Sequence, residues 1–273
     1  EEGRPAHRAA PVPDGPPLFL VGCVRSGTTL TRDLLRRVPG VICPEETHFL
    51  RWSEPFRTPA SMPPHTRNEV LRQHRAIDGV SEEVFADLLT SCLSKAELQR
   101  AYVAAFARAQ GVSGPYRWID KTPQNIYGGA LILSAFPSAR LLHIVRNPLN
   151  VVASMLMGRQ VSVPDVHGAI NYWGEAVQIA ATLRKAAPDR IMDLRYEDLV
   201  ADVPGVMAGV LRFAGIDAPP GLYARADAHP ERGLWRSALG PADRDAVVTR
   251  CGALALSHGY DLRACVASAA IAS

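Results

Sequence analysis

The fold is decided by the stretch LFLVGCVRSGTTLTRDLL at residues 18–35. Its first part, residues 18–24, is a continuous apolar run, which is typical of a strand buried on both faces. A turn containing glycine and serine follows. Apolar residues then recur at helical spacing from Leu30 to Val38, until Pro39 and Gly40 stop the pattern. The stretch therefore predicts a buried strand, a tight loop and a helix in direct succession.

The same order of elements continues further along the chain. The apolar run RLLHIV at residues 140–145 follows a helical pattern over 125–136, and RIMDLRY at 190–196 follows a longer helical pattern over about 166–187. Alternation of buried strands with helices is typical of an α/β fold. We therefore predict a P-loop-like parallel β-sheet flanked by helices on both faces.

The rest of the chain predicts the domain organisation. Residues 1–17 carry five prolines and few bulky side chains, so we expect a flexible leader. Residues 18–273 fit a single domain. Residues 53–115 are punctuated by prolines at first and then helical, and we interpret them as an insertion. Ligands of α/β domains bind at the carboxyl ends of the strands, where this insertion is placed to form a wall.

Composition predicts a globular protein and argues against nucleic-acid binding. With 47% hydrophobic and 21% charged residues, the chain is expected to be globular. Its net charge is only +3, and the thirty basic residues include just three lysines and no local cluster, so we expect no nucleic-acid partner. Oligomeric state is not readable from the sequence.

The cysteines and the apolar segments predict a compartment. Five scattered cysteines without a C-x-x-C pair indicate neither a disulfide framework nor a zinc site. No segment approaches the roughly 20 apolar residues that span a bilayer, and the N-terminus shows no apolar signal core. We expect a protein of the cytoplasm without a transmembrane segment.

The loop after the first strand resembles a phosphate-binding loop. Residues 22–29, GCVRSGTT, match G-x-x-x-x-G-K-[ST] except that Thr28 replaces the lysine, while Arg25 supplies a cation three residues earlier. Backbone N–H groups at a helix N-terminus attract anions, and the hydroxyls of Ser26, Thr28 and Thr29 add donors. The loop therefore predicts an anion site.

A second cation replaces the acid that would hold magnesium. The strand 140–145 ends in Arg146, where a triphosphate-hydrolysing enzyme would carry a metal-binding carboxylate. Ser154 lies about two turns into the helix that starts at Pro148, so packing of that helix decides whether Arg146 and Ser154 converge. Taken singly, they also fit a surface arginine and an ordinary helix serine. Together they indicate an anionic ligand bound without a metal.

Four segments resemble the sulfotransferase family that uses 3′-phosphoadenosine 5′-phosphosulfate. They lie in register between residue 18 and about 240. They are VGCVRSGTTLTRDLL at 21–35, DKTP at 120–123, LLHIVRNPLNVVASM at 141–155 and LRYEDLV at 194–200. The resemblance implies transfer of a sulfuryl group to an acceptor hydroxyl of a small molecule or phenol, with no metal required. It places the insertion 53–115 on the acceptor side.

The resemblance also implies which residues bind the donor nucleotide. The 5′-phosphosulfate is assigned to the loop residues Arg25, Ser26, Gly27, Thr28 and Thr29. The 3′-phosphate is assigned to Arg146 and Ser154, and the adenine to the neighbourhood of Tyr196. A looser match, Arg232–Arg236, implies that Trp235 and Arg236 belong to a loop that closes over the nucleotide.

Sulfuryl transfer needs a general base near the acceptor. The segment CPEETH at 43–48 resembles the acidic segment of the tyrosylprotein sulfotransferases, in which the second of two glutamates is the base. This implies Glu46. Glu45, and with less reason Glu46, could instead be first-turn helix carboxylates stabilised by the helix dipole. His48 is a rival base, because an imidazole titrates nearer neutrality.

The reaction also needs positive charge at the leaving oxygen. Lys121 of the DKTP segment fits this role, since a flexible ammonium can follow the developing charge, and Arg25 is the other cation assigned to catalysis. The other two lysines, Lys95 and Lys185, are expected on the surface. Asp120 either orients Lys121 or caps the next helix through Thr122.

Two other functions remain open. The glycine loop also fits a kinase-like P-loop phosphotransferase that binds a nucleotide triphosphate with magnesium. A non-catalytic nucleotide-binding relative would keep the loop and lose the chemistry. Arg51, Arg57 and Arg67 hint weakly at an anionic acceptor.

Overall fold

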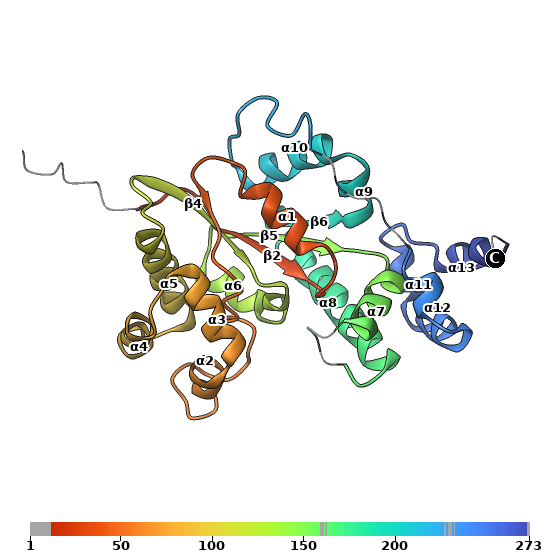
Figure 1. Ribbon diagram of the computed structural model, residues 1–273, viewed down its shortest axis with the longest axis horizontal. Helices are drawn as coiled ribbons and strands as arrows, with labels where there is room; N and C mark the ends of the chain where they lie inside the picture. The colour runs from red at the N-terminus through yellow and green to blue at the C-terminus, as the bar shows by residue number, and fades with distance from the viewer. Residues whose placement is uncertain are drawn as a thin grey trace, which may run out of the picture.

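The described strands form one parallel sheet in a computed structural model (Figure 1). The structure describes residues 12–158, 161, 163–226, 228, 231 and 233–271. The strand order is β1-β4-β2-β5-β6, and β3 also pairs with β4. The strands are β1 Val12–Pro13, β2 Leu18–Gly22, β3 Val41–Ile42, β4 Pro115–Lys121, β5 Arg140–Val145 and β6 Ile191–Arg195. The predicted parallel sheet is confirmed.

The register aligns the carboxyl ends of the central strands. Leu20 of β2 pairs with Lys121, the last residue of β4, and Gly22 pairs with Ile144 near the end of β5. Val145 in turn pairs with Arg195, the last residue of β6. The loops that follow these strands therefore emerge at one edge of the sheet, where α/β proteins bind ligands.

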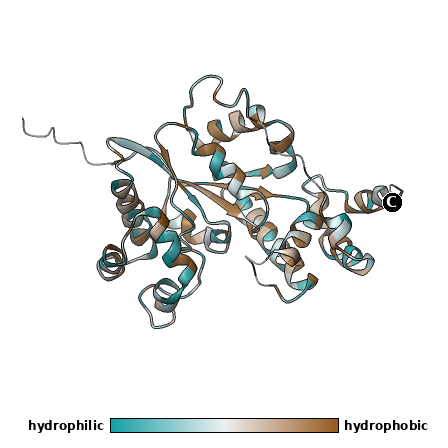
Figure 2. Ribbon diagram, in the orientation of Figure 1, coloured by the Kyte–Doolittle hydropathy of each residue, from teal (hydrophilic) through white to brown (hydrophobic). Residues whose placement is uncertain are grey.

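Side chains of β2 alternate between two hydrophobic cores. Phe19 and Val21 belong to a core shared with the helices α5 (Lys95–Ala109), α6 (Gly129–Ala135) and α8 (Val166–Ala186). Leu18 and Leu20 belong to a core shared with α1 (Thr28–Leu35), α9 (Tyr196–Ala201) and α10 (Val203–Ala214). Successive strand residues point to opposite faces, so an apolar strand needs cover on both. Figure 2 shows the central strands as hydrophobic ribbons between these two layers.

Helices cover both faces, as predicted from the alternation of elements. Figure 1 shows α1 and α10 on one face of the sheet and α6 and α8 on the other. The helices that follow or precede the central strands are α1 Thr28–Leu35, α6 Gly129–Ala135, α7 Pro148–Met157, α8 Val166–Ala186, α9 Tyr196–Ala201 and α10 Val203–Ala214. A 3-10 helix, Pro123–Gly128, precedes α6, so the helix expected over 125–136 is divided in two.

The segment 53–115, interpreted as an insertion, forms four helices beside the sheet (Figure 1). They are α2 Met62–Arg67, α3 Glu69–Asp78, α4 Glu82–Ser91 and α5 Lys95–Ala109. Ser81 and Ser94 cap the last two, each accepting a hydrogen bond from a first-turn backbone N–H. Lys95 was expected on the surface and is buried, because its ammonium donates to the carbonyl oxygen of Trp52. Lys185 is exposed, as expected.

Three further helices gather at the other end of the sheet, opposite α2–α5 (Figure 1). They are α11 Trp235–Ala238, α12 Pro241–Leu256 and α13 Leu262–Ile271. Within the described ranges no helix is long and apolar enough to cross a membrane.

The predicted leader lies only partly within the described residues. Val12 and Pro13 form the short strand β1, which pairs with Pro115 and Tyr116 of β4, where we expected no element. Arg117 also donates to the carbonyl oxygen of Asp14 at 3.1 Å. The sheet edge therefore orders part of a segment whose composition alone would not.

Candidate active site

The loop between β2 and α1 requires its two glycines. Gly22 has φ 141°, and a Cβ there would lie 2.6 Å from the carbonyl oxygen of Ile144. Gly27 has φ 95°, and its Cβ would lie 2.1 Å from the ring of Tyr196. Only glycine tolerates both the backbone angle and the close approach. Because α1 begins directly after Gly27, at Thr28, the N–H groups of its first turn lie beside the loop.

The loop has the properties of an anion site. Ser26 is fully buried, and its hydroxyl has no hydrogen-bond partner among the described residues. A buried hydroxyl without a partner is rare and indicates a group that a ligand can satisfy. Thr28 is also buried, whereas Thr29 is exposed on the first turn of α1. An orphan hydroxyl at a helix N-terminus fits a phosphate or phosphosulfate group.

Arg25 and Ser154 meet across the loop. Arg25 has φ 68°, a left-handed backbone angle that is uncommon for a residue with a side chain. Its Nε donates to the Oγ of Ser154 at 2.9 Å. Ser154 is nearly buried on α7, so this helix packs with the serine toward the loop. Arg25, expected at the 5′-phosphosulfate, and Ser154, expected at the 3′-phosphate, are thus in direct contact.

Arg146 joins the same group. Its guanidinium donates to the carbonyl oxygen of Arg25 at 3.1 Å and lies 4.4 Å from the ring centroid of Tyr196. Arg146, Ser154 and Tyr196 therefore surround the loop. The packing of α7, which the sequence left open, brings Arg146 and Ser154 to the two ends of Arg25.

A carboxylate that the sequence did not single out pairs with Arg146. The Oε2 of Glu231 lies 2.7 Å from Nε and 2.6 Å from an Nη of Arg146. Both contacts go to one carboxylate oxygen, which occupies the Nε–Nη side of the guanidinium that a phosphate oxygen could also use. Glu231 therefore holds the position on Arg146 that an anionic ligand would need. The sequence around it shows no periodic pattern that would have pointed to it.

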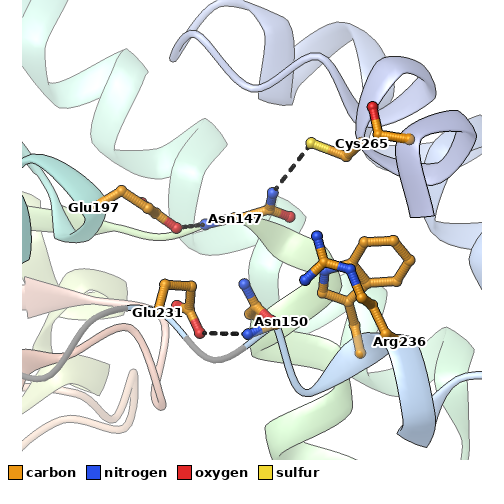
Figure 3. A pocket seen from close by; sticks show the side chains of 9 residues that line it. Asn147, Asn150, Glu197, Glu231, Arg236 and Cys265 are labelled. Carbon is orange, nitrogen blue, oxygen red and sulfur yellow. Dashed lines mark hydrogen bonds between the residues drawn. The ribbon is translucent and has the colours of Figure 1, made fainter. Parts of the chain in front are cut away.

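A pocket of about 340 Å³ opens beside this pair. Figure 3 shows its labelled side chains in two groups around Asn147 and Asn150, with Glu197 and Glu231 on one side and Arg236 and Cys265 on the other. The backbone N–H of Asn147 donates to Glu197 at 3.0 Å. Asn150 is buried, and its side-chain oxygen has no partner among the described residues. The pocket thus offers an unsatisfied acceptor in the wall that Glu231 also lines.

The loosely matched segment lies at this pocket. Trp235 lines it but is only 3% exposed, and the guanidinium of Arg236 lies 5.1 Å from its ring centroid. Arg232 lies outside the described residues. The structure thus brings Trp235 and Arg236 to the pocket that Glu231, the partner of Arg146, also lines.

Glu46 and Lys121 form an ion pair at the carboxyl end of β4. Lys121 is 4% exposed, and the second carboxylate oxygen of Glu46 lies 3.3 Å from Nε2 of His48. Burial by itself would raise the pKa of Glu46, but the contact with His48 and the charge of Lys121 outweigh it and lower this pKa to about 2. Glu46 is therefore ionised in the free protein, between two donors.

Glu45 does not have the helix position considered for it. Residues 43–48 are not helical, so the alternative of a first-turn helix carboxylate is wrong for both glutamates. Glu45 instead accepts two hydrogen bonds from Arg32 of α1, at 3.1 and 3.0 Å. Its backbone N–H donates to Asp78 at 2.9 Å. These contacts connect Glu45 to α1 and α3, whereas Glu46 pairs with Lys121.

Asp120 has a role that the sequence did not predict. It is fully buried and accepts hydrogen bonds from Thr47 at 2.9 Å, Gln99 at 3.3 Å and Asn125 at 2.8 Å. Burial raises its pKa despite these donors. Thr122 caps no helix end through its side chain, and its hydroxyl accepts from the backbone of Thr47. Asp120 therefore fixes the residue between Glu46 and His48.

His143 is the core histidine expected from its strand. It is fully buried, and its Nδ1 lies 2.9 Å from a carboxylate oxygen of Asp193. Among the described residues no group of three or more His, Cys, Asp or Glu side chains is arranged to hold a metal ion.

Comparison with known proteins gives consistent results. The family model described as "Sulfotransferase family" matches residues 16–220, more than half of the chain. The protein-tyrosine sulfotransferase of Drosophila melanogaster is 28% identical over 211 residues, which are 75% of this chain and 38% of that protein. The omega-hydroxy-beta-dihydromenaquinone-9 sulfotransferase Stf3 of Mycobacterium tuberculosis is 23% identical over 255 residues, covering 74% of this chain and 63% of that protein. The chain thus spans less than two thirds of either relative.

The fold has solved relatives as well. The sulfotransferase domain from the Synechococcus PCC 7002 olefin synthase superposes with a TM-score of 0.63 at 23% identity, over 96% of this chain and 99% of that domain. At this identity the likeness concerns the fold: the arrangement of a parallel sheet, loop and covering helices is shared.

Proposed function

The chain belongs to the sulfotransferase family, and from this premise we propose that it transfers a sulfuryl group from 3′-phosphoadenosine 5′-phosphosulfate to an acceptor hydroxyl. The observation that carries the proposal is the meeting of two groups at one sheet edge. Lys121, ion-paired with Glu46, ends β4 opposite Leu20, two residues before the phosphate-type loop begins. A base candidate and a cation therefore lie next to an anion site.

The loop and the residues around it supply the donor-binding groups. The orphan hydroxyl of Ser26 and the N-terminus of α1 fit the 5′-phosphosulfate, together with Arg25, Gly27, Thr28 and Thr29. Arg146 and Ser154 would hold the 3′-phosphate, with Tyr196 near the adenine and Trp235 and Arg236 at its outer side. When bound, the donor supplies a sulfuryl group whose bond to the phosphate oxygen breaks as a bond to the acceptor oxygen forms.

Glu46 and Lys121 divide the remaining tasks. The ionised carboxylate of Glu46 accepts the proton that leaves the acceptor hydroxyl. The ammonium of Lys121 supplies positive charge where negative charge develops on the leaving oxygen, and Arg25, fixed by Ser154, supplies a second cation. Contact between Lys121 and Glu46 lowers the basicity of the carboxylate in the free protein. We expect Glu46 to become a stronger base when Lys121 turns to an anion.

The acceptor is proposed to be the hydroxyl of a small molecule or of an exposed phenol. The names of the two curated relatives both specify hydroxyl-bearing acceptors, a protein tyrosine and a hydroxylated menaquinone. The segment 53–115 lies on the side of Glu46 and would form the acceptor wall, since His74 of α3 contacts the Glu46 carbonyl oxygen at 3.0 Å. All five cysteines are free thiols, which supports a reducing compartment such as the cytoplasm.

Two measurements test the function. Calorimetric titration should show tight binding of adenosine 3′,5′-bisphosphate and weak binding of ATP with magnesium; tight binding of ATP with magnesium alone would refute the proposal in favour of phosphoryl transfer. Incubation with radiolabelled donor and a panel of phenols, sugars, peptides and alcohols should label at least one acceptor class.

Variants separate an enzyme from a non-catalytic relative. Glu46→Gln and Lys121→Ala should each lower turnover by at least about 100-fold, the scale of a lost acid–base or electrostatic contribution. The matched controls are Glu69→Gln and Lys185→Ala, which change exposed residues on α3 and α8 and should leave turnover unchanged. Transfer that is absent in the unaltered protein, with the nucleotide still bound, would identify a binding protein.

A further inference from the structure

His48 lies between the carboxylate of Glu46 and the guanidinium of Arg51. Its Nε2 is 3.3 Å from Oε2 of Glu46, and its Nδ1 is 3.3 Å from an Nη of Arg51. Both ring nitrogens therefore have partners within the protein. The two contacts differ in kind, because one partner only accepts hydrogen bonds and the other only donates them.

These partners select one form of the imidazole. A guanidinium has no lone pair to offer, so Arg51 donates and Nδ1 of His48 accepts. The ring proton must then lie on Nε2, where it is donated to the ionised carboxylate of Glu46. A doubly protonated ring would place a proton of Nδ1 against the N–H of Arg51. The geometry thus specifies a neutral His48 with its proton on Nε2.

The same contacts show which group keeps a free lone pair. In the neutral ring Nδ1 has a single lone pair, and Arg51 uses it. Each carboxylate oxygen of Glu46 has about two acceptor positions, and Lys121 and His48 use one on each oxygen. Glu46 can therefore accept a further proton without breaking a contact, whereas His48 must first lose Arg51.

The backbone and the neighbours of His48 hold this arrangement in place. His48 has φ 57°, in the left-handed region, so its conformation is imposed by the surrounding structure. Arg51 is itself fixed, since it donates to the side-chain oxygen of Gln124, whose amide donates to Tyr172. Its guanidinium also lies 5.1 Å from the ring centroid of Trp52.

We propose that Arg51 and His48 are positioning residues, which act through Glu46 and fix its carboxylate as the proton acceptor of the reaction. Arg51 selects the tautomer of His48, and the Nε2–H of His48 sets the rotation of the Glu46 carboxylate while leaving it a free lone pair. That Glu46 accepts a proton in the reaction rests on the proposed function, whereas the tautomer of His48 and its contacts do not. The charged and titratable groups that face this unit are Lys121 and Asp120 of β4, His65 of α2 and Tyr172 of α8.

The tautomer can be measured without donor or acceptor. Long-range 1H–15N NMR of the free protein at pH 7, with the His48 signals assigned by their loss in His48→Gln, should show a neutral ring with its proton on Nε2. In Arg51→Met the proton should be shared between the two nitrogens. A ring protonated on Nδ1, or on both nitrogens, in the unaltered protein would overturn the proposal.

Turnover separates a positioning role from a base. In His48→Gln a side-chain N–H replaces the Nε2–H, so turnover should stay within about 10-fold of the unaltered enzyme, whereas His48→Leu should lose about 10- to 100-fold, as outer contacts of a site typically do. The KM for the donor should change little in either, and calorimetry with adenosine 3′,5′-bisphosphate confirms that each variant folds. The Arg51→Met variant should also lose kcat, but by a smaller factor than His48→Leu.

Each failure points to a different premise. If His48→Gln falls as far as Glu46→Gln, His48 is the base and the positioning role is refuted. If Glu46→Gln keeps full turnover while His48→Leu loses it, the proposed base is wrong. If adenosine 3′,5′-bisphosphate does not bind any form, the proposed function fails, and the NMR result still decides the tautomer.

Discussion

The contact between Glu231 and Arg146 predicts that a carboxylate competes with the donor nucleotide. One carboxylate oxygen of Glu231 accepts from Nε and from an Nη of the guanidinium that we assign to the 3′-phosphate, at 2.7 and 2.6 Å. A phosphate needs the same face of the guanidinium, so it must displace the carboxylate. Glu231→Gln keeps the shape of the side chain and removes its charge. Nucleotide affinity should therefore rise.

The size of the gain follows from the burial of the pair. Two unit charges about 4 Å apart attract by about 4 kcal/mol at an effective dielectric constant near 20, while exposed pairs measure only about 0.2–1 kcal/mol. The side chains of Arg146 and Glu231 are 15% and 19% exposed, which places this pair between the limits. Since a hydrogen bond to a charged group is worth about 1 kcal/mol more than a neutral one, affinity should increase by about 5- to 10-fold.

Calorimetry with two ligands tests this value. Adenosine 3′,5′-bisphosphate should bind Glu231→Gln more tightly, whereas adenosine 5′-monophosphate, which lacks the 3′-phosphate, should bind both forms equally. Glu69→Gln, which alters a glutamate paired with Arg72 on the exposed side of α3, serves as the control and should change neither affinity. Equal tightening for both ligands would show that Glu231 acts by closing the pocket, and no tightening would refute the competition.

Three further changes test the site. Gly27→Ala should lower the melting temperature and weaken binding of adenosine 3′,5′-bisphosphate, since its Cβ would lie 2.1 Å from the Tyr196 ring. The control Gly111→Ala, also at positive φ but with no atom within 4 Å, should cost only the backbone strain of about 1 kcal/mol. Equal losses of stability in the two variants would refute the contact with Tyr196. Ser26→Ala should leave the free energy of unfolding unchanged or higher, because it removes an unsatisfied buried hydroxyl. The same variant should weaken nucleotide binding several-fold. A loss of stability in urea titration would show that the hydroxyl already has a partner. Glu46→Gln should cost about 3 kcal/mol of unfolding free energy at pH 7 by leaving a buried ammonium unpaired. Because the pKa of Glu46 is lowered from 4.5 to about 2, the stability that its charge contributes is complete above pH 4.5 and is lost as the pH falls toward 2. The difference in unfolding free energy between Glu46→Gln and the unaltered protein should therefore shrink over that range. A difference that does not change with pH would contradict the lowered pKa.

Local sequence patterns were sufficient to predict the order of strands and helices and the parallel sheet. The apolar run of β2 and the helical spacing after it concern neighbouring residues, and burial on both faces follows from such a run alone. The loop between them could be identified as an anion site because glycines and hydroxyls in that context serve few other purposes. The same local reading was wrong about Lys95, since a lysine in a polar helix gives no sign of a distant carbonyl that it can reach.

Contacts between distant segments had no such signal. Asp120 and Thr47 are 73 residues apart, and Arg146 and Glu231 are 85 apart. A buried acid within DKTP could have been suspected of a structural role, but its partners come from three separate elements. Glu231 follows no periodicity, so only the path of the chain brings it to the guanidinium.

The sequence by itself determined the strand, loop and helix order, the family resemblance and the candidates Glu46, His48 and Lys121, because each depends on residue type and short spacing. Only the tertiary structure decided which of these candidates can accept a proton and which ones position it. It placed Arg51 on one nitrogen of His48 and Glu46 on the other. The roles of the three side chains depend on which lone pairs are already used, and this is a property of directions in space that no spacing along the chain records.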